Sequence, residues 1–245
     1  MNAPFPNPPP PARQPIFNLP GIIVAVLVVL VGIHAIREFV LSQDVDRQFV
    51  FAFAFVPIRE TAPLLYDNVF PAGAARLWTF VTYALLHGDW AHVGFNAMWL
   101  AAFGSPLAWR FGPWRFVLFS AVGAAAGALL HLAFYPDSIV PMVGASAAIS
   151  APMAAAGRFV FASGGPMWRS GGAAAYRLPA APLTEIIRDR RVMLFLGMWF
   201  GLNLLFGIGA VSDTITSGAI AWDAHIGGFL AGLLLFPLFD PIRTA

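Results

Sequence analysis

The chain has 245 residues, of which 59% are hydrophobic and only 11% are charged. Soluble domains usually carry about 25% charged residues, so this composition excludes an ordinary soluble domain. The net charge of +2 does not suit a nucleic-acid-binding surface, and the lack of cysteine excludes disulfides and thiolate metal sites. Long apolar runs separated by short polar breaks predict an all-α polytopic membrane protein.

Residues 1–18 are expected to form a proline-rich, disordered cytoplasmic tail, because repeated prolines favour extended backbone and offer no apolar face to bury. Residues 19–240 are then expected to form one membrane domain. Its first span covers residues 19–41, which is too long for the apolar core of a signal peptide. His34 lies inside this span and is given no role.

Residues 43–86 form the longest segment without a predicted span. The apolar run at 49–55 is too short to cross a bilayer as a helix, so we expect a long, membrane-associated first loop. Trp78 and Tyr83 in this loop are typical of the aromatic belt at a membrane surface.

Five further spans complete a predicted six-helix bundle. The second begins near His87 or Ala91 and ends before Arg110, and the others cover about 114–134, 142–161, 192–211 and 222–239. Arginines gather between spans two and three and between spans four and five. The positive-inside rule therefore places both termini in the cytoplasm, although the long first loop also carries three arginines.

Polar residues stand near the start of the even-numbered spans: His92 and Asn96 in the second, Ser146 in the fourth and His225 in the sixth. All three spans are predicted to enter from the outer face, which puts these residues at a similar shallow depth. Serine is a weak nucleophile until a base takes its proton, and histidine titrates near neutral pH. The pattern indicates one site with Ser146 as nucleophile and His225 as base.

A serine that attacks a carbonyl produces an oxyanion, which needs fixed hydrogen-bond donors. His92, Asn96 and the backbone N–H of Ser146 are candidates, and the N-terminal end of the fourth span adds partial positive charge. Gly228 and Gly232 form a Gly-x-x-x-Gly pair that allows close approach of a neighbouring helix. This chemistry requires water in the outer half of the bundle, and we expect no cofactor.

Two other assignments of these polar residues are disfavoured. His87, His92 and His225 offer a histidine-only metal site, but no carboxylate or thiolate accompanies them, so no metal is expected. Asp223 is two residues from His225, and side chains at that spacing diverge on a helix, so it is not assigned as a catalytic acid. His131 is interpreted as structural.

With these residues assembled, the chain resembles the rhomboid family of intramembrane serine proteases over about residues 76–235. The family patterns His-x4-His-x3-Asn, Gly-x-Ser and Ala-His-x-x-Gly occur in this order, on the second, fourth and sixth predicted spans. The matching positions are His87, His92, Asn96, Gly144, Ser146, Ala224, His225 and Gly228.

The resemblance implies a six-helix rhomboid-like bundle with a catalytic dyad of Ser146 and His225 and no acid. It implies that His92 and Asn96 bind the oxyanion, with His87, Gly144 and Gly228 in supporting positions. The implied activity is an intramembrane serine endopeptidase acting on transmembrane protein substrates in the lipid bilayer, here expected to be a bacterial inner membrane. The physiological substrate, the cleavage-site preference and the oligomeric state stay open.

Three positions depart from the family pattern. Ala147 follows the serine where glycine is usual, and Ser150 stands where many members have an aromatic residue that stacks on the catalytic histidine. In the first loop, Trp78 is followed by Thr79 rather than by arginine. These departures concern the support of the His225 ring and the anchoring of the loop, and leave the serine and histidine intact.

Two alternative functions belong to other classes. An inert rhomboid-like protein would bind membrane clients without cutting them, but such members lack one residue of the dyad. A small transporter could use the histidines as a proton relay, but transporters usually show internal repeats, and the chain shows none. Bulky residues of the fifth span, such as Trp199 and Phe200, are candidates for a movable wall through which a substrate helix reaches Ser146.

Overall fold

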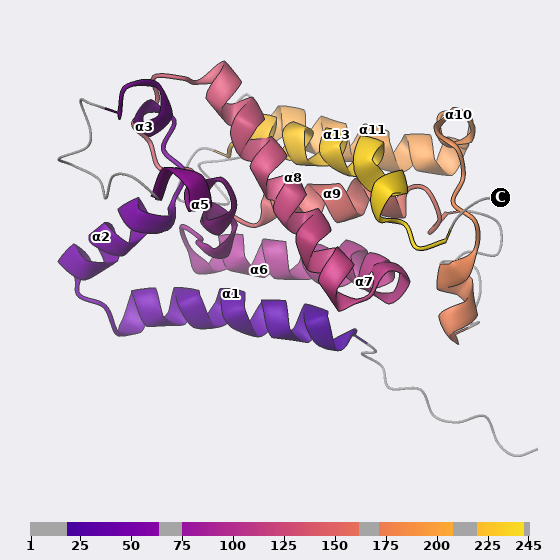
Figure 1. The fold of residues 1–245 in the computed structure, drawn as a ribbon, viewed down its shortest axis with the longest axis horizontal. Coiled ribbons are helices and arrows are strands. Elements are labelled where there is room, and N and C mark those ends of the chain that lie inside the picture. Colours follow the sequence, from indigo (N-terminus) through magenta and orange to yellow (C-terminus); the bar gives the residue numbers. More distant parts are fainter. Residues whose placement is uncertain (1–18, 64–74, 162–171, 208–219, 243–245) are drawn as a thin grey trace, which may run out of the picture.

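The computed structural model describes residues 19–63, 75–161, 172–207 and 220–242, and in these ranges the protein is built from helices (Figure 1). The described ranges contain no strand, but an isolated antiparallel β-bridge joins Phe55 and Met142. The all-α fold class is confirmed. The expected proline-rich tail at residues 1–18 lies outside the described residues.

Within the described ranges, three helices are long and apolar enough to cross a membrane by themselves: α1 (Gly21–Phe39), α8 (Pro113–Phe134) and α13 (Trp222–Phe239). The second predicted span is a run of α6 (Trp90–Trp99), the π-helical segment η2 (Leu100–Gly104) and α7 (Ser105–Phe111). The remaining long helix is α11 (Arg190–Gly207). By length and hydropathy alone these helices do not establish six spans, so that count stays a prediction.

The predicted fourth span is wrong at both ends, because α9 covers only Ser146–Ala156. Before it the chain is extended, and Met142 exchanges backbone hydrogen bonds of 2.7 and 3.2 Å with Phe55 of the first loop. Gly144 then adopts φ +123°, a backbone conformation that side chains rarely permit. This long-range pairing delays the helix until Ser146 itself.

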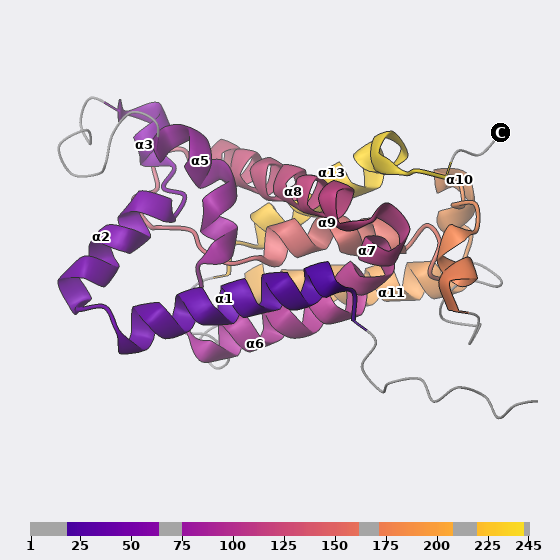
Figure 2. The same cartoon turned by 60° about the horizontal axis from the view of Figure 1, so that its bottom comes forward.

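The helices that carry the predicted site residues begin at the same end of the molecule. Figures 1 and 2 show α6, α9 and α13 starting at the end that carries α2, α3 and α5, and running toward the end that carries α10. Other short helices among the described residues are α2 (Gln43–Phe53), α3 (Ile58–Thr61), α5 (Ala75–Thr82) and α10 (Leu183–Ile186). The first turns of α6, α9 and α13 are therefore gathered in one region.

Small residues let α9 lie close against both α8 and α13. A Cβ added to Gly228 would collide with the carbonyl oxygen of Ala147, and one added to Gly232 would collide with the backbone of Ala151. On α8, a Cβ at Gly127 would lie 2.6 Å from the Cβ of Ala147. The close approach expected of the fourth and sixth spans is thus observed, and Gly127 provides the space for the methyl group of Ala147.

Tyr83 does not lie in an aromatic belt, which corrects the interpretation of the first loop. It lies at the end of the loop, in the short 3₁₀ helix η1 (Tyr83–Leu85), and the residue is only 1% exposed. Its hydroxyl donates a 2.8 Å hydrogen bond to Ala124 O of α8, and its carbonyl accepts a 3.1 Å bond from Gly144 N–H. Tyr83 therefore ties the first loop to the segment that precedes Ser146.

The rest of the first loop is held by side chains that donate to backbone carbonyls. The Trp78 indole donates to Ala52 O at 2.9 Å, and the buried Arg59 guanidinium donates to Phe51 O at 2.6 Å. Thr79, at the position where the family usually has arginine, is fully buried. The loop is anchored from α2 and α3 without an arginine at position 79.

Candidate active site

Ser146 is the first residue of α9, and its surroundings are set by the turn before it. The Ala145 N–H points to Nε2 of the buried His87 at 3.4 Å. The first amides of a helix have no partner inside the helix, so the Ser146 N–H stands at the positive end of α9. This is the local geometry that an oxyanion donor next to a nucleophile requires.

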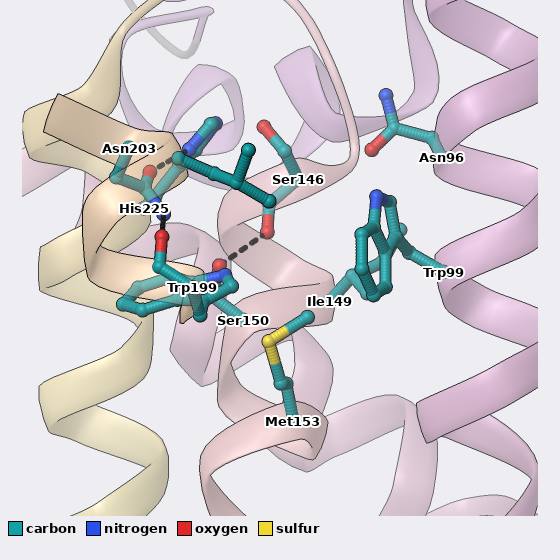
Figure 3. A pocket seen from close by; sticks show the side chains of 10 residues that line it. Asn96, Trp99, Ser146, Ile149, Ser150, Met153, Trp199, Asn203 and His225 are labelled. Atoms are coloured by element: carbon teal, nitrogen blue, oxygen red, sulfur yellow. Dashed lines mark hydrogen bonds between the residues drawn. The ribbon is translucent and has the colours of Figure 1, made fainter. Parts of the chain in front are cut away.

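Ser146 and His225 line the same cavity, of about 90 Å³, which Figure 3 shows from close by. The other lining residues are Asn96, Trp99, Ile149, Ser150, Met153, Trp199, Leu202 and Asn203. In the described part of the chain, which includes both residues, no hydrogen bond joins Ser146 to His225. Catalytic hydrogen bonds are often long before substrate binds, so the lack of this hydrogen bond is compatible with a nucleophile and its base.

The two predicted oxyanion residues occupy different places. Asn96 is buried and lines the cavity, and its Nδ2 donates one hydrogen to His92 O at 3.0 Å, leaving the second hydrogen for another acceptor. His92 lies beside the cavity, behind Gly144, where a Cβ on the glycine would be 2.6 Å from its Nε2. Its ring meets His87 edge to face, with centroids 5.0 Å apart.

Asp223 makes its contact on the side of α8. Its Oδ2 lies 2.8 Å from Nδ1 of His131, and its side chain is 1% exposed. As predicted, Asp223 makes no hydrogen bond to His225, and its contact with His131 is partly buried. The described part of the chain also holds no group of three or more His, Cys, Asp or Glu side chains arranged to bind a metal ion.

The sequence interpretation missed Asn203, on α11. Its Oδ1 lies 2.6 Å from Nδ1 of His225 (Figure 3), and the residue is 5% exposed. The available signal was a lone amide inside an apolar helix, a setting in which polar side chains usually have a partner. That signal shows neither which helix supplies the partner nor that the partner is His225.

The departures next to the serine also have a structural explanation. Ser150 lies one turn after Ser146, and its hydroxyl donates a 2.8 Å hydrogen bond to Ser146 O. Trp199 of α11 lines the same cavity as Ser150, and its ring stacks on Phe229 of α13. The His225 ring is thus supported by α11, through Asn203, rather than by an aromatic residue at position 150.

Together, the fold and the site define an integral membrane protein of packed apolar helices, with a serine and a histidine facing one small cavity at one end of the bundle. A family model described as "Rhomboid domain" matches residues 74–240, more than half of the chain. The protein therefore belongs to the rhomboid family, whose members are usually intramembrane serine proteases. The predicted family resemblance is confirmed.

Proposed function

We propose that this protein is an intramembrane serine endopeptidase that cuts peptide bonds in or near the transmembrane segments of other membrane proteins. The observation that carries the proposal is that Ser146 of α9 and His225 of α13 line one cavity. In this reaction the Ser146 hydroxyl attacks the peptide carbonyl while His225 takes its proton. His225 then returns a proton to the leaving amine, and water hydrolyses the acyl-enzyme.

The tetrahedral intermediate needs donors aimed at its negative oxygen. In this proposal the donors are the Ser146 N–H at the start of α9 and the second hydrogen of Asn96 Nδ2, and the support for them is that Ser146 and Asn96 both line the cavity. We also assign His92 as an oxyanion donor. His87 and Gly144 are assigned to hold the turn that precedes Ser146. Gly228 supports the site by letting α13 approach α9.

The proposed setting is a bacterial inner membrane with both termini in the cytoplasm and the cavity toward the outer face. Two observations support the proposed orientation. The arginines gather in the loops predicted to be cytoplasmic. The helices α6, α9 and α13 also start at the same end of the bundle, as alternate spans of a six-span protein would (Figure 1).

The decisive experiment measures cleavage of a reconstituted transmembrane substrate by folded variants. Ser146→Ala removes the nucleophile and His225→Ala removes the base, so both are expected to fall to background. The double variant should be little worse than either, because the two residues act as one unit. Asp223→Ala is the control and should stay within about tenfold of the wild type, since Asp223 contacts His131 instead.

A serine-reactive covalent probe provides the companion measurement. The protease should be labelled, and the label should disappear in Ser146→Ala. A wild type that is neither labelled nor able to cleave would rule out the protease and leave the inert family member as the alternative. Normal cleavage by Ser146→Ala would rule out the proposed mechanism altogether.

A further inference from the structure

Both polar ends of the Asn203 side chain are engaged at the cavity wall. Nδ2 donates a 2.9 Å hydrogen bond to Trp199 O, one turn earlier on α11. Oδ1 lies 2.6 Å from Nδ1 of His225 (Figure 3). A buried amide with both ends satisfied has a single orientation, because turning it over would point a donor at His225 and an acceptor at a carbonyl.

This orientation fixes the proton on the histidine. Trp199 O can only accept a hydrogen bond, so it must face the Nδ2 group of Asn203. The amide oxygen then faces His225, and a bond at 2.6 Å requires Nδ1 of the neutral ring to be the donor. The lone pair of the neutral imidazole is consequently on Nε2, the nitrogen left for Ser146.

We propose that Asn203 is a positioning residue for His225, holding it in the Nδ1–H tautomer with Nε2 as the base. This inference rests on the proposed protease function and extends the dyad by a third, uncharged group. A side-chain amide orients the histidine in some cysteine proteases, so a carboxylate is not required for this task. An amide also avoids placing an ionised group in the apolar interior, where charge is costly.

A second contact between α11 and α13 lies one helical turn from the contact of Asn203 with His225. Trp199 and Asn203 are four residues apart on α11, and His225 and Phe229 are four apart on α13. Trp199 stacks on Phe229 with centroids 4.6 Å apart, while Asn203 contacts His225. Two successive turns of α11 therefore set the position of the α13 turn that carries the base, so the orientation of His225 depends on where α11 lies.

The kinetic test compares three variants on a reconstituted transmembrane substrate. Asn203→Leu keeps the branching and heavy-atom number of the side chain but removes the acceptor. It should lower kcat by at least about tenfold, a part of the about 10²–10⁴-fold that general acid–base catalysis contributes, with KM unchanged. Asn203→Asp keeps an acceptor oxygen and should retain clearly more kcat than Asn203→Leu. Leu204→Ala, an exposed neighbour on α11, is the control and should keep kcat near the wild-type value.

The spectroscopic test does not depend on activity. In ¹⁵N-histidine-labelled protein in bilayers, the His225 signals are assigned by difference from His225→Gln. Wild-type His225 in its neutral form should show a proton on Nδ1, and this preference should be lost in Asn203→Leu. If Asn203→Leu does not fold, the wild-type tautomer still decides the question, because a neutral His225 with its proton on Nε2 refutes the positioning role.

The outcomes separate this inference from the proposed function. A wild type that cleaves no substrate refutes the protease. An active wild type refutes only the positioning role if folded Asn203→Leu keeps its kcat, if Asn203→Asp is no better than Asn203→Leu, or if neutral His225 carries its proton on Nε2.

Discussion

The backbone conformation of Gly144 determines the position of Ser146 at the start of α9. Its φ of +123° turns the chain into α9, and its N–H donates to Tyr83 O at 3.1 Å. Any side chain at this position would also meet the His92 ring. The glycine of the Gly-x-Ser motif is therefore needed both for backbone conformation and for space, which links the motif to the position of the nucleophile.

The two predicted oxyanion residues can be tested separately. Asn96→Ala and His92→Ala each remove one donor, and each is expected to lower the cleavage rate by about 10², the low end for such a loss, since water can partly substitute in a hydrated cavity. Because His92 packs behind Gly144, its removal should also lower the thermal unfolding temperature. Kinetics and unfolding scans on purified variants measure both effects. Unchanged cleavage by Asn96→Ala would exclude it as a donor.

α9 and α11 differ in the fraction of their residues that is buried. Nearly every residue of α9 is buried between its neighbours, whereas α11 exposes large side chains such as Met198 and Leu204. Among its contacts with α13 are the stacking of Trp199 and the edge-to-face contact of Phe200, both on Phe229. Of these two helices, α11 is thus the better candidate for a wall that moves to admit a substrate helix.

Phe200→Ala tests that wall without touching the cavity lining. Loss of its contact with Phe229, at 5.5 Å between centroids, should loosen α11 and raise the cleavage of membrane substrates. The free energy of unfolding should fall by about 1 kcal/mol, the size of one aromatic pair. Leu194→Ala, on the exposed part of the same helix, is the control and should change neither quantity. Unchanged or lower activity in well-folded Phe200→Ala would count against a gate in α11.

The end of the bundle away from the cavity is held by a buried ion pair. Arg110 of α7 contacts Asp240, just after α13, through two hydrogen bonds of 2.9 and 2.7 Å. The same guanidinium donates to the carbonyls of Tyr176 and Leu178 and lies over the ring of Phe159. One side chain thereby joins α7, the 172–187 segment and the end of α13, far from the catalytic chemistry.

Asp240→Ala should destabilise the whole bundle. It leaves the fully buried Arg110 charge without its carboxylate, a change that usually costs about 3–5 kcal/mol. Asp46→Ala breaks the more exposed pair with Arg37 and should cost at most about 1 kcal/mol. Equilibrium unfolding in detergent measures both, and equal losses in the two variants would contradict the special importance of the buried pair.

The orientation in the membrane is a separate prediction. A reporter fused to the C-terminus should be active only if it works in the cytoplasm, because the arginine-rich loops are placed on that side. A matched reporter that works only outside the inner membrane serves as the control and should be silent. Activity of the outer reporter alone would reverse the proposed topology and place the cavity at the opposite face.

Apolar length determined the position of most long helices, because a hydrophobic run and its flanking prolines and glycines are local properties. The span predicted at 114–134 coincides with the helix Pro113–Phe134, and that predicted at 222–239 coincides with the helix Trp222–Phe239. The spacing of His92, Asn96, Ser146 and His225 likewise located the candidate site, since motifs are read along the chain. The space for the Ala147 methyl group could not be predicted from the motif, because Gly127, which provides it, belongs to another helix.

Only the tertiary structure decided the features that depend on residues distant in the sequence. The start of α9 at Ser146 follows from the pairing of Met142 with Phe55, and the burial of Tyr83 follows from its contact with α8. The partner of His225 is Asn203, on a neighbouring helix. Hydropathy records that a polar residue lies in an apolar helix, but the packing of helices determines which group it meets, and that choice sets the chemistry of the site.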